Sequence, residues 1–364
     1  MAENKIVAIL LPNLGGGGAE MVSINLSKFL IQNGFTVHFI LLQKKGEFLR
    51  IIPENIKIFC INKIRFRDSI FPLASYFKKN NPQFIFVNMW PLTTIAVLSW
   101  VLAGRKGKLF LVDHSILSHS ILNVKFYKKL VLKLSIMITY PLANKVIGVS
   151  KGVINDIISL GQLHKDKAIY IYNPLTIKNR VYFPKKIPVS WEDSSFKILS
   201  IGRFTEEKNH KLLIKAFQIL KKTNIGAKLI ILGDGSLYRE TKEFVKNLGL
   251  ENHIHLPGFV LDTEPFFIHA DLFVLSSNVE GFGNVIVEAL SYGVPVVSTD
   301  CPSGPSEILD RGKFGTLVPI EDAESLAEAI KLNLYKEFDK EFLINRSLDF
   351  SVDKMAQKYL DLLI

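Results

Sequence analysis

The sequence contains little cysteine and no long hydrophobic run. Its two cysteines, Cys60 and Cys301, cannot build a disulfide framework, which favours a reducing compartment. An uncharged, mostly apolar stretch that starts at a proline covers residues 91–103, whereas a membrane-spanning helix needs about 20 residues. The N-terminal residues carry one lysine before a six-residue apolar run, which is too little for a secretory signal peptide. The sequence therefore predicts a cytoplasmic protein that contacts a membrane only peripherally.

Acidic residues are scarce in the first half of the chain. Residues 1–185 carry 25 Lys and Arg against 8 Asp and Glu, whereas residues 186–364 carry 20 against 26. The formal net charge of +11 thus combines a strongly basic half with a mildly acidic one. Such asymmetry indicates that the first half faces an anionic membrane surface, a nucleic acid or an anionic ligand. An apolar content of 48% excludes an intrinsically disordered chain.

Short apolar runs alternate with longer helical patterns along the whole chain. Runs such as IVAILL at 6–11 and FIFVNM at 84–89 are typical of strands buried on both faces. Residues 182–195 hold two prolines and no helical period, and the alternation restarts after them. We therefore expect two doubly wound α/β domains that face each other across a ligand-binding cleft, residues 1–182 and 195–345. A last amphipathic helix is expected at 352–364.

A glycine-rich turn, GGGGAE at 15–20, stands between the first strand and the first helix. Glycines let the backbone approach a phosphate closely, and the N-terminus of the following helix favours the anion. A dinucleotide fingerprint would need a third glycine where Glu20 stands, so NAD binding is disfavoured. A phosphate-binding loop and a merely flexible turn are both compatible with the motif.

Two basic residues follow the first strand of the second half. Arg203 and Lys208 stand five positions apart at an expected strand-to-helix turn. An arginine offers a planar fork of donors and a lysine a point charge, so the two could clamp a diphosphate. Taken alone, the motif fits a solvated basic loop better.

The most specific motif is EGFGNVIVE, which begins with Glu280 and ends with Glu288. It follows an expected strand and opens a helix near Gly283 and Asn284, whose free backbone N–H groups would attract an anion. A glycosidase would need its two carboxylates within roughly 5–9.5 Å of each other. Eight residues of helix span about 12 Å, so a hydrolase is disfavoured.

Taken together, the motifs resemble a known family, the retaining nucleotide-sugar glycosyltransferases of family 4 with the GT-B fold. The resemblance covers nearly the whole chain. It rests on GGAE at 17–20, DHS at 113–115, VS at 149–150, GR at 202–203 with Lys208, LGDG at 232–235, LPGFV at 256–260, and the two spaced glutamates Glu280 and Glu288. The GT-B fold implies two Rossmann-like domains facing across a cleft, with the C-terminal helix packing back on the N-terminal domain. By this resemblance the first domain binds the acceptor and the second binds the nucleotide-sugar donor.

The resemblance implies catalytic roles for a few matched residues. Gly17 and Gly18 would approach the donor diphosphate, and Arg203 and Lys208 would hold it while negative charge develops on the leaving nucleotide. Glu280 would contact the transferred sugar without acting as a covalent nucleophile. The expected route to retention is attack on the same face, with a donor phosphate oxygen helping to remove the acceptor proton.

Further residues match the family's donor site. Glu288 would accept two ribose hydroxyls, and His114 would lie near the donor sugar and the reaction centre, although a histidine after an apolar strand is more often structural. The remaining matches are Phe259 and Val260 at the edge of the base pocket, and the backbone of Phe282, Gly283, Asn284 and Val285 near the sugar.

No metal or other cofactor is expected, and the nucleotide-sugar is a co-substrate. The sequence has no Asp-x-Asp pair that would hold a divalent ion on a diphosphate. His253 and His255 alternate like residues on one strand face, but no third ligand is evident. Metal-independent transfer is therefore preferred.

The chain also departs from the family pattern. The usual Asn-Gly near position 173 is replaced by Asn173-Pro174-Leu175. Residues 301–307, CPSGPSE, look like those of bacterial transferases that assemble surface polysaccharides, lipopolysaccharide and lipid-linked glycans. This similarity favours a UDP-sugar donor over a GDP-sugar donor.

A basic amphipathic helix is expected within residues 119–144. Its lysines Lys125, Lys128, Lys129 and Lys133 accompany an apolar stripe. The stripe consists of Tyr127, Leu130, Val131, Leu134 and Ile138. Such a helix can lie in an anionic membrane interface, and an ordinary surface helix whose stripe faces the core is the alternative. No nucleic-acid-binding motif is found, so a nucleic-acid partner is not expected.

These observations predict a bacterial hexosyltransferase, peripheral on the inner face of the cytoplasmic membrane. It would transfer a hexose or N-acetylhexosamine from a UDP-sugar to a lipid-linked or surface glycan. The alternatives are a GDP-sugar-dependent, mannosyl-type transferase of the same fold and, from another class, a non-catalytic basic lipid-binding module.

Overall fold

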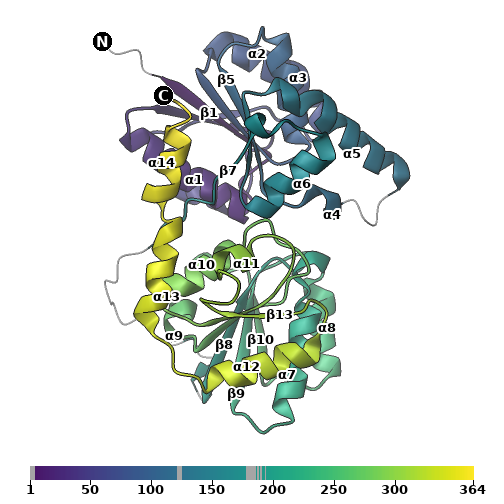
Figure 1. Cartoon of the computed structure of the whole chain (residues 1–364), viewed down its shortest axis with the longest axis vertical. Coiled ribbons are helices and arrows are strands. Elements are labelled where there is room, and N and C mark those ends of the chain that lie inside the picture. Colours follow the sequence, from purple (N-terminus) through teal and green to yellow (C-terminus); the bar gives the residue numbers. More distant parts are fainter. Residues whose placement is uncertain (1–4, 121–124, 178–185, 187, 189–190, 193) are drawn as a thin grey trace. The chain divides into compact units, whose positions relative to one another are not determined.

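The computed structural model describes the chain except residues 1–4, 121–124, 178–185, 187, 189–190 and 193. The chain folds into two compact units (Figure 1). The first contains residues 1–176 and 350–364, and the second contains residues 177–349. None of the helices in the described part of the chain has the length and apolarity that crossing a membrane requires.

The first unit is built on a seven-stranded parallel sheet with the order β3-β2-β1-β4-β5-β6-β7. The strands are β1 (Ile6–Leu11), β2 (Thr36–Leu41), β3 (Lys57–Cys60), β4 (Phe84–Asn88), β5 (Lys108–Asp113), β6 (Lys145–Gly148) and β7 (Ala168–Tyr170). The central strands are buried along almost their whole length, as their unbroken apolar runs require. The strand order reverses between β1 and β4, where doubly wound sheets place their ligands, at the carboxyl ends of the strands.

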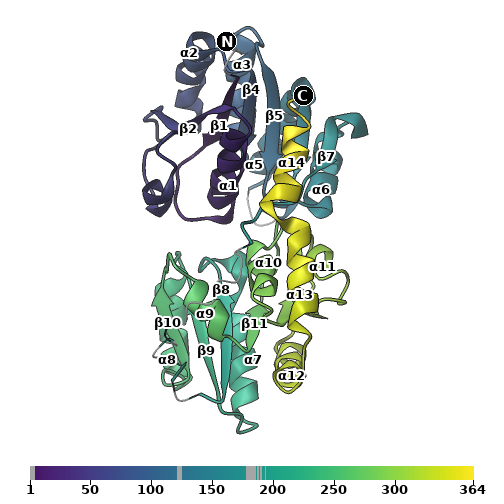
Figure 2. The same ribbon diagram turned by 90° about the vertical axis from the view of Figure 1, so that its left-hand side faces the viewer.

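Helices cover both faces of this sheet (Figure 1). They are α1 (Gly18–Gln32), α2 (Ile70–Asn80), α3 (Leu92–Leu102), α4 (Leu117–Ser120), α5 (Phe126–Thr139), α6 (Lys151–Gly161) and α14 (Val352–Leu360), with 3-10 turns η1 (Glu47–Ile51), η2 (Phe66–Ser69), η3 (Tyr140–Leu142) and η4 (Lys165–Lys167). The C-terminal helix α14 packs beside α1 (Figures 1 and 2). Its Tyr359 contacts the ring of Phe86 in the sheet, with ring centroids 5.7 Å apart. The expected return of the C-terminal helix to the first domain is therefore confirmed.

The second unit has a six-stranded parallel sheet with the order β10-β9-β8-β11-β12-β13. The strands are β8 (Phe196–Ile201), β9 (Ala227–Leu232), β10 (Ile254–Gly258), β11 (Leu272–Leu275), β12 (Val296–Thr299) and β13 (Thr316–Val318). The helices are α7 (His210–Lys221), α8 (Tyr238–Asn247), α9 (Glu264–His269), α10 (Asn284–Ser291), α11 (Pro305–Ile308), α12 (Ala323–Leu334) and α13 (Lys340–Ser347), with 3-10 turns η6 (Glu206–Lys208) and η7 (Leu348–Phe350). The switch point of this sheet lies between β8 and β11.

The second unit has its own hydrophobic core, which includes Leu213 and Phe217 from α7 and Leu229 from β9. Each unit thus buries both faces of a parallel sheet, and the prediction of two Rossmann-like domains is confirmed. The first unit ends at residue 176 and resumes at 350, whereas the sequence suggested 182 and 352.

Candidate active site

The glycine-rich turn leads directly from β1 into α1. Gly17 is the N-cap of α1 and Gly18 is its first residue, so both predicted glycines lie at a helix N-terminus. A Cβ atom on Gly17 would lie 2.6 Å from the Glu20 carboxylate oxygen Oε2. Because Gly17 has no side chain, the backbone of the turn can approach a ligand closely.

The loop around Gly46, a glycine that the sequence analysis did not single out, packs against this turn and holds it in place. Gly46 adopts φ +118°, and a Cβ atom there would lie 1.9 Å from the Leu14 carbonyl oxygen. The backbone N–H of Leu14 donates to the Lys45 carbonyl at 2.9 Å, and the N–H of Phe48 donates to the Leu14 carbonyl at 3.2 Å. The only sequence signal for this role is a lone glycine in the loop after β2.

His114 directly follows β5 at the carboxyl edge of the first sheet. Its ring nitrogen Nε2 lies 2.9 Å from Oδ1 of Asn88, the last residue of β4. The Asn88 amide nitrogen donates to the Leu10 carbonyl at 3.2 Å. Desolvation lowers the pKa of His114 to about 4, so the ring is neutral at pH 7. The sequence predicted His114 but not its partner Asn88.

Asp113, next to His114, is buried at the end of β5. Its Oδ2 accepts a hydrogen bond from the Tyr140 hydroxyl at 2.8 Å, and this hydroxyl lies 2.9 Å from Oγ1 of Thr93. Desolvation raises the pKa of Asp113 to about 7, although the Tyr140 hydrogen bond acts in the opposite direction. Asp113 therefore belongs to a buried polar group inside the first unit.

In the second unit, the structure brings together two predicted residues that are 72 positions apart. Lys208, at the end of η6, places its Nζ 2.5 Å from Oε1 of Glu280. The Ser277 hydroxyl donates to the same oxygen at 2.7 Å, and the Glu280 side chain is only 7% exposed. The Lys208 main chain is held by the Ser276 hydroxyl, which donates to its carbonyl at 3.1 Å. Two serine hydroxyls that follow β11 thus hold the Glu280 side chain and the Lys208 backbone.

The loop that carries Glu280 is fixed from the end of the neighbouring strand. The Thr299 hydroxyl donates to the Ser277 carbonyl at 2.6 Å, and the Ser303 hydroxyl donates to the Gly281 carbonyl at 2.9 Å. A Cβ atom on Gly304 would lie 1.7 Å from the Phe282 carbonyl oxygen, so the two chains touch through their backbones. The motif at residues 301–307, noted in the sequence for its family likeness, therefore supports the Glu280 loop.

Helix α10 begins directly after this loop. Gly283 is its N-cap with φ +100°, and no side chain caps the helix there. Asn284 and Val285 form the first turn, which carries no acidic residue. The positive end of the helix dipole therefore lies close in sequence to the Lys208–Glu280 contact and favours an anion. Glu288 lies on the same helix, in its second turn.

The loops that end β8, β9 and β10 pack on one another through glycines. The Gly202 N–H donates to the Leu232 carbonyl at 3.0 Å, and the Gly233 N–H donates to the Gly258 carbonyl at 2.9 Å. A Cβ atom on Gly233 would lie 2.0 Å from the Gly202 carbonyl oxygen. This packing brings the strand end that carries Arg203 and the strand end that carries Phe259 and Val260 to the same edge of the sheet.

Not every predicted residue joins the Lys208–Glu280 contact. Arg203 is exposed, and the side chain of Phe259 is 42% exposed directly after β10. His255 is the second residue of β10, and His253 directly precedes the strand. Within the described ranges, no group of three or more His, Cys, Asp or Glu side chains is arranged to hold a metal ion.

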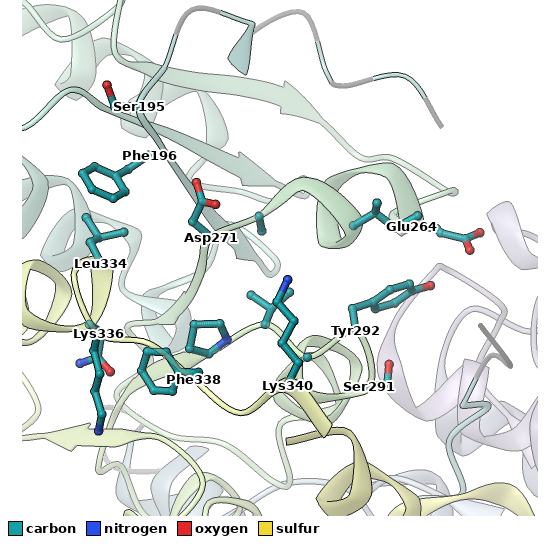
Figure 3. A pocket seen from close by; sticks show the side chains of 16 residues that line it. Ser195, Phe196, Glu264, Asp271, Ser291, Tyr292, Leu334, Lys336, Phe338 and Lys340 are labelled. Atoms are coloured by element: carbon teal, nitrogen blue, oxygen red, sulfur yellow. The ribbon is translucent and has the colours of Figure 1, made fainter. Parts of the chain in front are cut away.

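A cavity of 310 Å³ lies elsewhere in the second unit. Its lining includes Phe196, Asp271 and Pro295, at or next to the first residues of β8, β11 and β12. Figure 3 shows Phe196 and Phe338 on one side of it and Tyr292 on the other. The cavity is therefore at the amino ends of the strands, whereas Lys208 and Glu280 follow carboxyl ends, and it is not the predicted donor site.

Two protein families match successive parts of the chain. Residues 16–178 match the model described as Glycosyltransferase Family 4, and residues 184–345 match Glycosyl transferases group 1. The chain is 32% identical over 344 residues to the Campylobacter jejuni N-acetylgalactosamine-N,N'-diacetylbacillosaminyl-diphospho-undecaprenol 4-alpha-N-acetylgalactosaminyltransferase, covering 90% of each chain.

Another Campylobacter jejuni relative acts, by its name, on a diNAcBac-PP-undecaprenol-linked glycan as an alpha-1,4-N-acetyl-D-galactosaminyltransferase. It is 25% identical over 379 residues, with 98% of each chain covered. Anabaena HepE, solved in complex with UDP-glucose, superposes with a TM-score of 0.83 at 21% identity, covering 98% of this chain and 99% of that one. This chain belongs to glycosyltransferase family 4, has the fold of GT-B enzymes and is a hexosyltransferase.

Proposed function

We propose that this member of glycosyltransferase family 4 transfers a hexose or N-acetylhexosamine, with retention of configuration, from a UDP-sugar to a lipid-linked or surface glycan. The observation that carries the proposal is the contact of Lys208 with Glu280 beside the N-terminus of α10. The donor class is supported by the UDP-glucose in the Anabaena HepE complex. The acceptor class is supported by the undecaprenol-linked glycans in the names of the Campylobacter jejuni relatives.

In the proposed reaction, the bond between the anomeric carbon and the donor phosphate breaks, and a bond from that carbon to an acceptor hydroxyl oxygen forms on the same face. The acceptor proton passes to a phosphate oxygen of the leaving UDP. Lys208 and Arg203 hold the diphosphate and stabilise the charge that develops on it. Glu280 contacts the sugar through its carboxylate and keeps Lys208 in place.

The remaining donor contacts follow from the same loops. Backbone N–H groups at the start of α10, from Phe282 to Val285, would bind the anionic part of the donor. Glu288 would accept the ribose hydroxyls, and Phe259 and Val260 would border the uracil ring. From the first unit, we propose that Gly17, Gly18 and His114 also contact the donor. No metal or other cofactor is needed, because Arg203, Lys208 and the helix dipole supply the positive charge.

Helix α5 supports the proposed contact with a membrane. Leu132, Ile136 and Thr139 are its buried residues. The five side chains of the predicted apolar stripe instead have exposed fractions between 43% and 65%, so the stripe does not face the core. Three lysines, Lys125, Lys128 and Lys133, are exposed on the same helix, and Lys129 is partly exposed. We therefore propose that α5 lies in an anionic membrane interface, on the inner face of the cytoplasmic membrane.

A thermal-shift panel of UDP- and GDP-sugars, followed by analysis of the transfer product, tests the proposal. A donor that binds only the folded state raises stability by about 2.7 kcal/mol at a hundredfold excess over its Kd. We expect a shift with a UDP-hexose or UDP-N-acetylhexosamine, and activity that survives EDTA. Stabilisation by GDP-mannose alone would contradict the donor class. Lipid binding without stabilisation by any nucleotide-sugar would instead indicate the non-catalytic module.

A further inference from the structure

Asn88 links the Leu10 carbonyl to the His114 ring through two hydrogen bonds. The Leu10 carbonyl determines which group is the donor in each of them. The Leu10 carbonyl oxygen can only accept, so the Asn88 group 3.2 Å from it is the amide NH2. This orientation turns the Asn88 oxygen Oδ1 toward Nε2 of His114, at 2.9 Å. Because Oδ1 can also only accept, Nε2 is the ring nitrogen that carries the proton.

The other ring nitrogen of His114 is left with a lone pair. Desolvation lowers the pKa of His114 to about 4, so the imidazole carries a single proton at pH 7. The carboxylate of the neighbouring Asp113 accepts a hydrogen bond from Tyr140 instead of from His114. Nδ1 has no hydrogen-bond partner among the residues that the structure describes, and the side chain is partly exposed.

We propose that Asn88 is a positioning residue that holds His114 in its Nε2-protonated form, so that Nδ1 is presented as a hydrogen-bond acceptor to the donor sugar. The inference rests on the proposed function, because it takes His114 to lie at the sugar. A neutral acceptor selects a ligand group that donates, such as a sugar hydroxyl or an amide N–H. It disfavours a deoxy sugar, an O-methyl ether or a uronate carboxylate at that position.

The state of the ring can be measured in the free, full-length protein by NMR of 15N-labelled histidine side chains. The His114 signals are those that His114→Gln removes. We expect a protonated Nε2, an unprotonated Nδ1, and no titration across neutral pH. A protonated Nδ1, or titration of the ring near its ordinary pKa of about 6.5, would overturn the inference without any variant of Asn88.

The Asn88→Leu variant tests the positioning role. Leu is close in size but neither donates nor accepts, so we expect the Nε2 proton to lose its hydrogen-bonded signature and an Nδ1-protonated population to appear. The matched control is Asn80→Leu, because the Asn80 amide also donates to a backbone carbonyl, that of Tyr76, but its hydrogen bond lies in α2 and does not involve His114. An Asn88→Leu spectrum identical to that of Asn80→Leu would refute the role.

Kinetics with UDP-N-acetylgalactosamine and its mono-deoxy analogues separate this inference from the proposed function. With the parent sugar, Asn88→Leu should lower kcat/KM by about 3- to 10-fold, the value of one neutral hydrogen bond. With the analogue that lacks the contacted hydroxyl, wild type and Asn88→Leu should be equal. An equal loss on every analogue would contradict the positioning role. No transfer by the wild type would contradict the donor class and leave the NMR result standing.

Discussion

The Lys208 ammonium and the Glu280 carboxylate form an ion pair with 2.5 Å between Nζ and Oε1, and Ser277 donates to the same carboxylate oxygen. Glu280 is almost fully buried, and these two donors satisfy its carboxylate oxygen Oε1. Removing one partner of a buried pair leaves the other without compensation, at a cost of about 3–5 kcal/mol. The function proposed for each residue therefore depends on the position of the other.

Replacing either member of this pair should remove most sugar transfer. For Lys208→Ala we expect kcat to fall by about 100-fold or more, because the change removes positive charge at the proposed leaving diphosphate. Glu280→Gln should cause a similar loss, because it removes the carboxylate that is proposed to contact the sugar and to keep Lys208 in place. Product formation from the UDP-sugar and the far-UV spectrum of each variant are the measurements. The matched control is Lys211→Ala, which breaks the exposed Lys211–Glu240 pair of the same unit. Full activity of both site variants, with folding intact, would contradict the assignment.

Changing Lys125, Lys128, Lys129 and Lys133 of α5 to glutamine should weaken membrane binding. Each lysine near an anionic surface contributes about 1 kcal/mol, so the affinity for anionic vesicles should fall by at least about 100-fold. Co-sedimentation with anionic vesicles measures it, and neutral vesicles show the non-electrostatic part. A control with the same charge change replaces four exposed lysines of α7 and α8 and of the loop after α7, namely Lys215, Lys222, Lys242 and Lys246. Equal vesicle binding of both variants would refute the role of α5.

Gly46→Ala should destabilise the turn before α1. The new Cβ atom would lie 1.9 Å from the Leu14 carbonyl oxygen in a backbone conformation open only to glycine, so we expect a loss of about 3 kcal/mol or more. Gly34→Ala is the control, because Gly34 also has a positive φ but no atom within 4 Å of the added carbon, and about 1 kcal/mol is expected there. Urea unfolding compares the two. Equal losses of unfolding free energy in Gly46→Ala and Gly34→Ala would show that Gly46 does not stabilise the turn.

Asp113 should give the stability of the protein a particular pH dependence. Its pKa in the folded state is raised to about 7 from the ordinary 3.8. Between these values the folded state holds a proton that the unfolded state has released, so stability falls as pH rises, by up to about 1.4 kcal/mol per pH unit. Above the folded-state pKa this contribution is constant.

The Asp113→Asn variant cannot titrate at this position and still offers an oxygen to the Tyr140 hydroxyl. We therefore expect its free energy of unfolding, measured in urea from mildly acidic to neutral pH, to fall less steeply with pH than that of the wild type. Asp310→Asn, at an exposed position, should keep the wild-type slope. A wild-type slope in Asp113→Asn would contradict the role of this carboxyl.

Sequence patterns predicted long periodic elements better than short ones. Strand β1 covers residues 6–11, as its unbroken apolar run indicated, and the last helix, expected at 352–364, begins at residue 352 and ends at residue 360. Strand β7 has only three residues, and a run that short has no readable period. The apolar positions of helix α13 do not form a clear stripe, so no period indicates it.

The residues of the candidate site also differ in how clearly the sequence alone indicates them. The spacing of Glu280 and Glu288, and the five positions between Arg203 and Lys208, are local features that the sequence displays. The partners Ser277 and Asn88 are not, because an isolated serine or asparagine in a sequence has no pattern that distinguishes it.

The sequence by itself determined that this chain forms two doubly wound domains with an anion-binding helix start in the second, because hydrophobic period, glycine turns and motif order are written along the chain. Only the tertiary structure decided which groups meet. Parallel strands bring residues from distant segments to one sheet edge, so that Lys208 contacts Glu280, and Asn88 orients His114. It also decided that the apolar stripe of α5 is exposed, since a helix covers the core with only one of its faces.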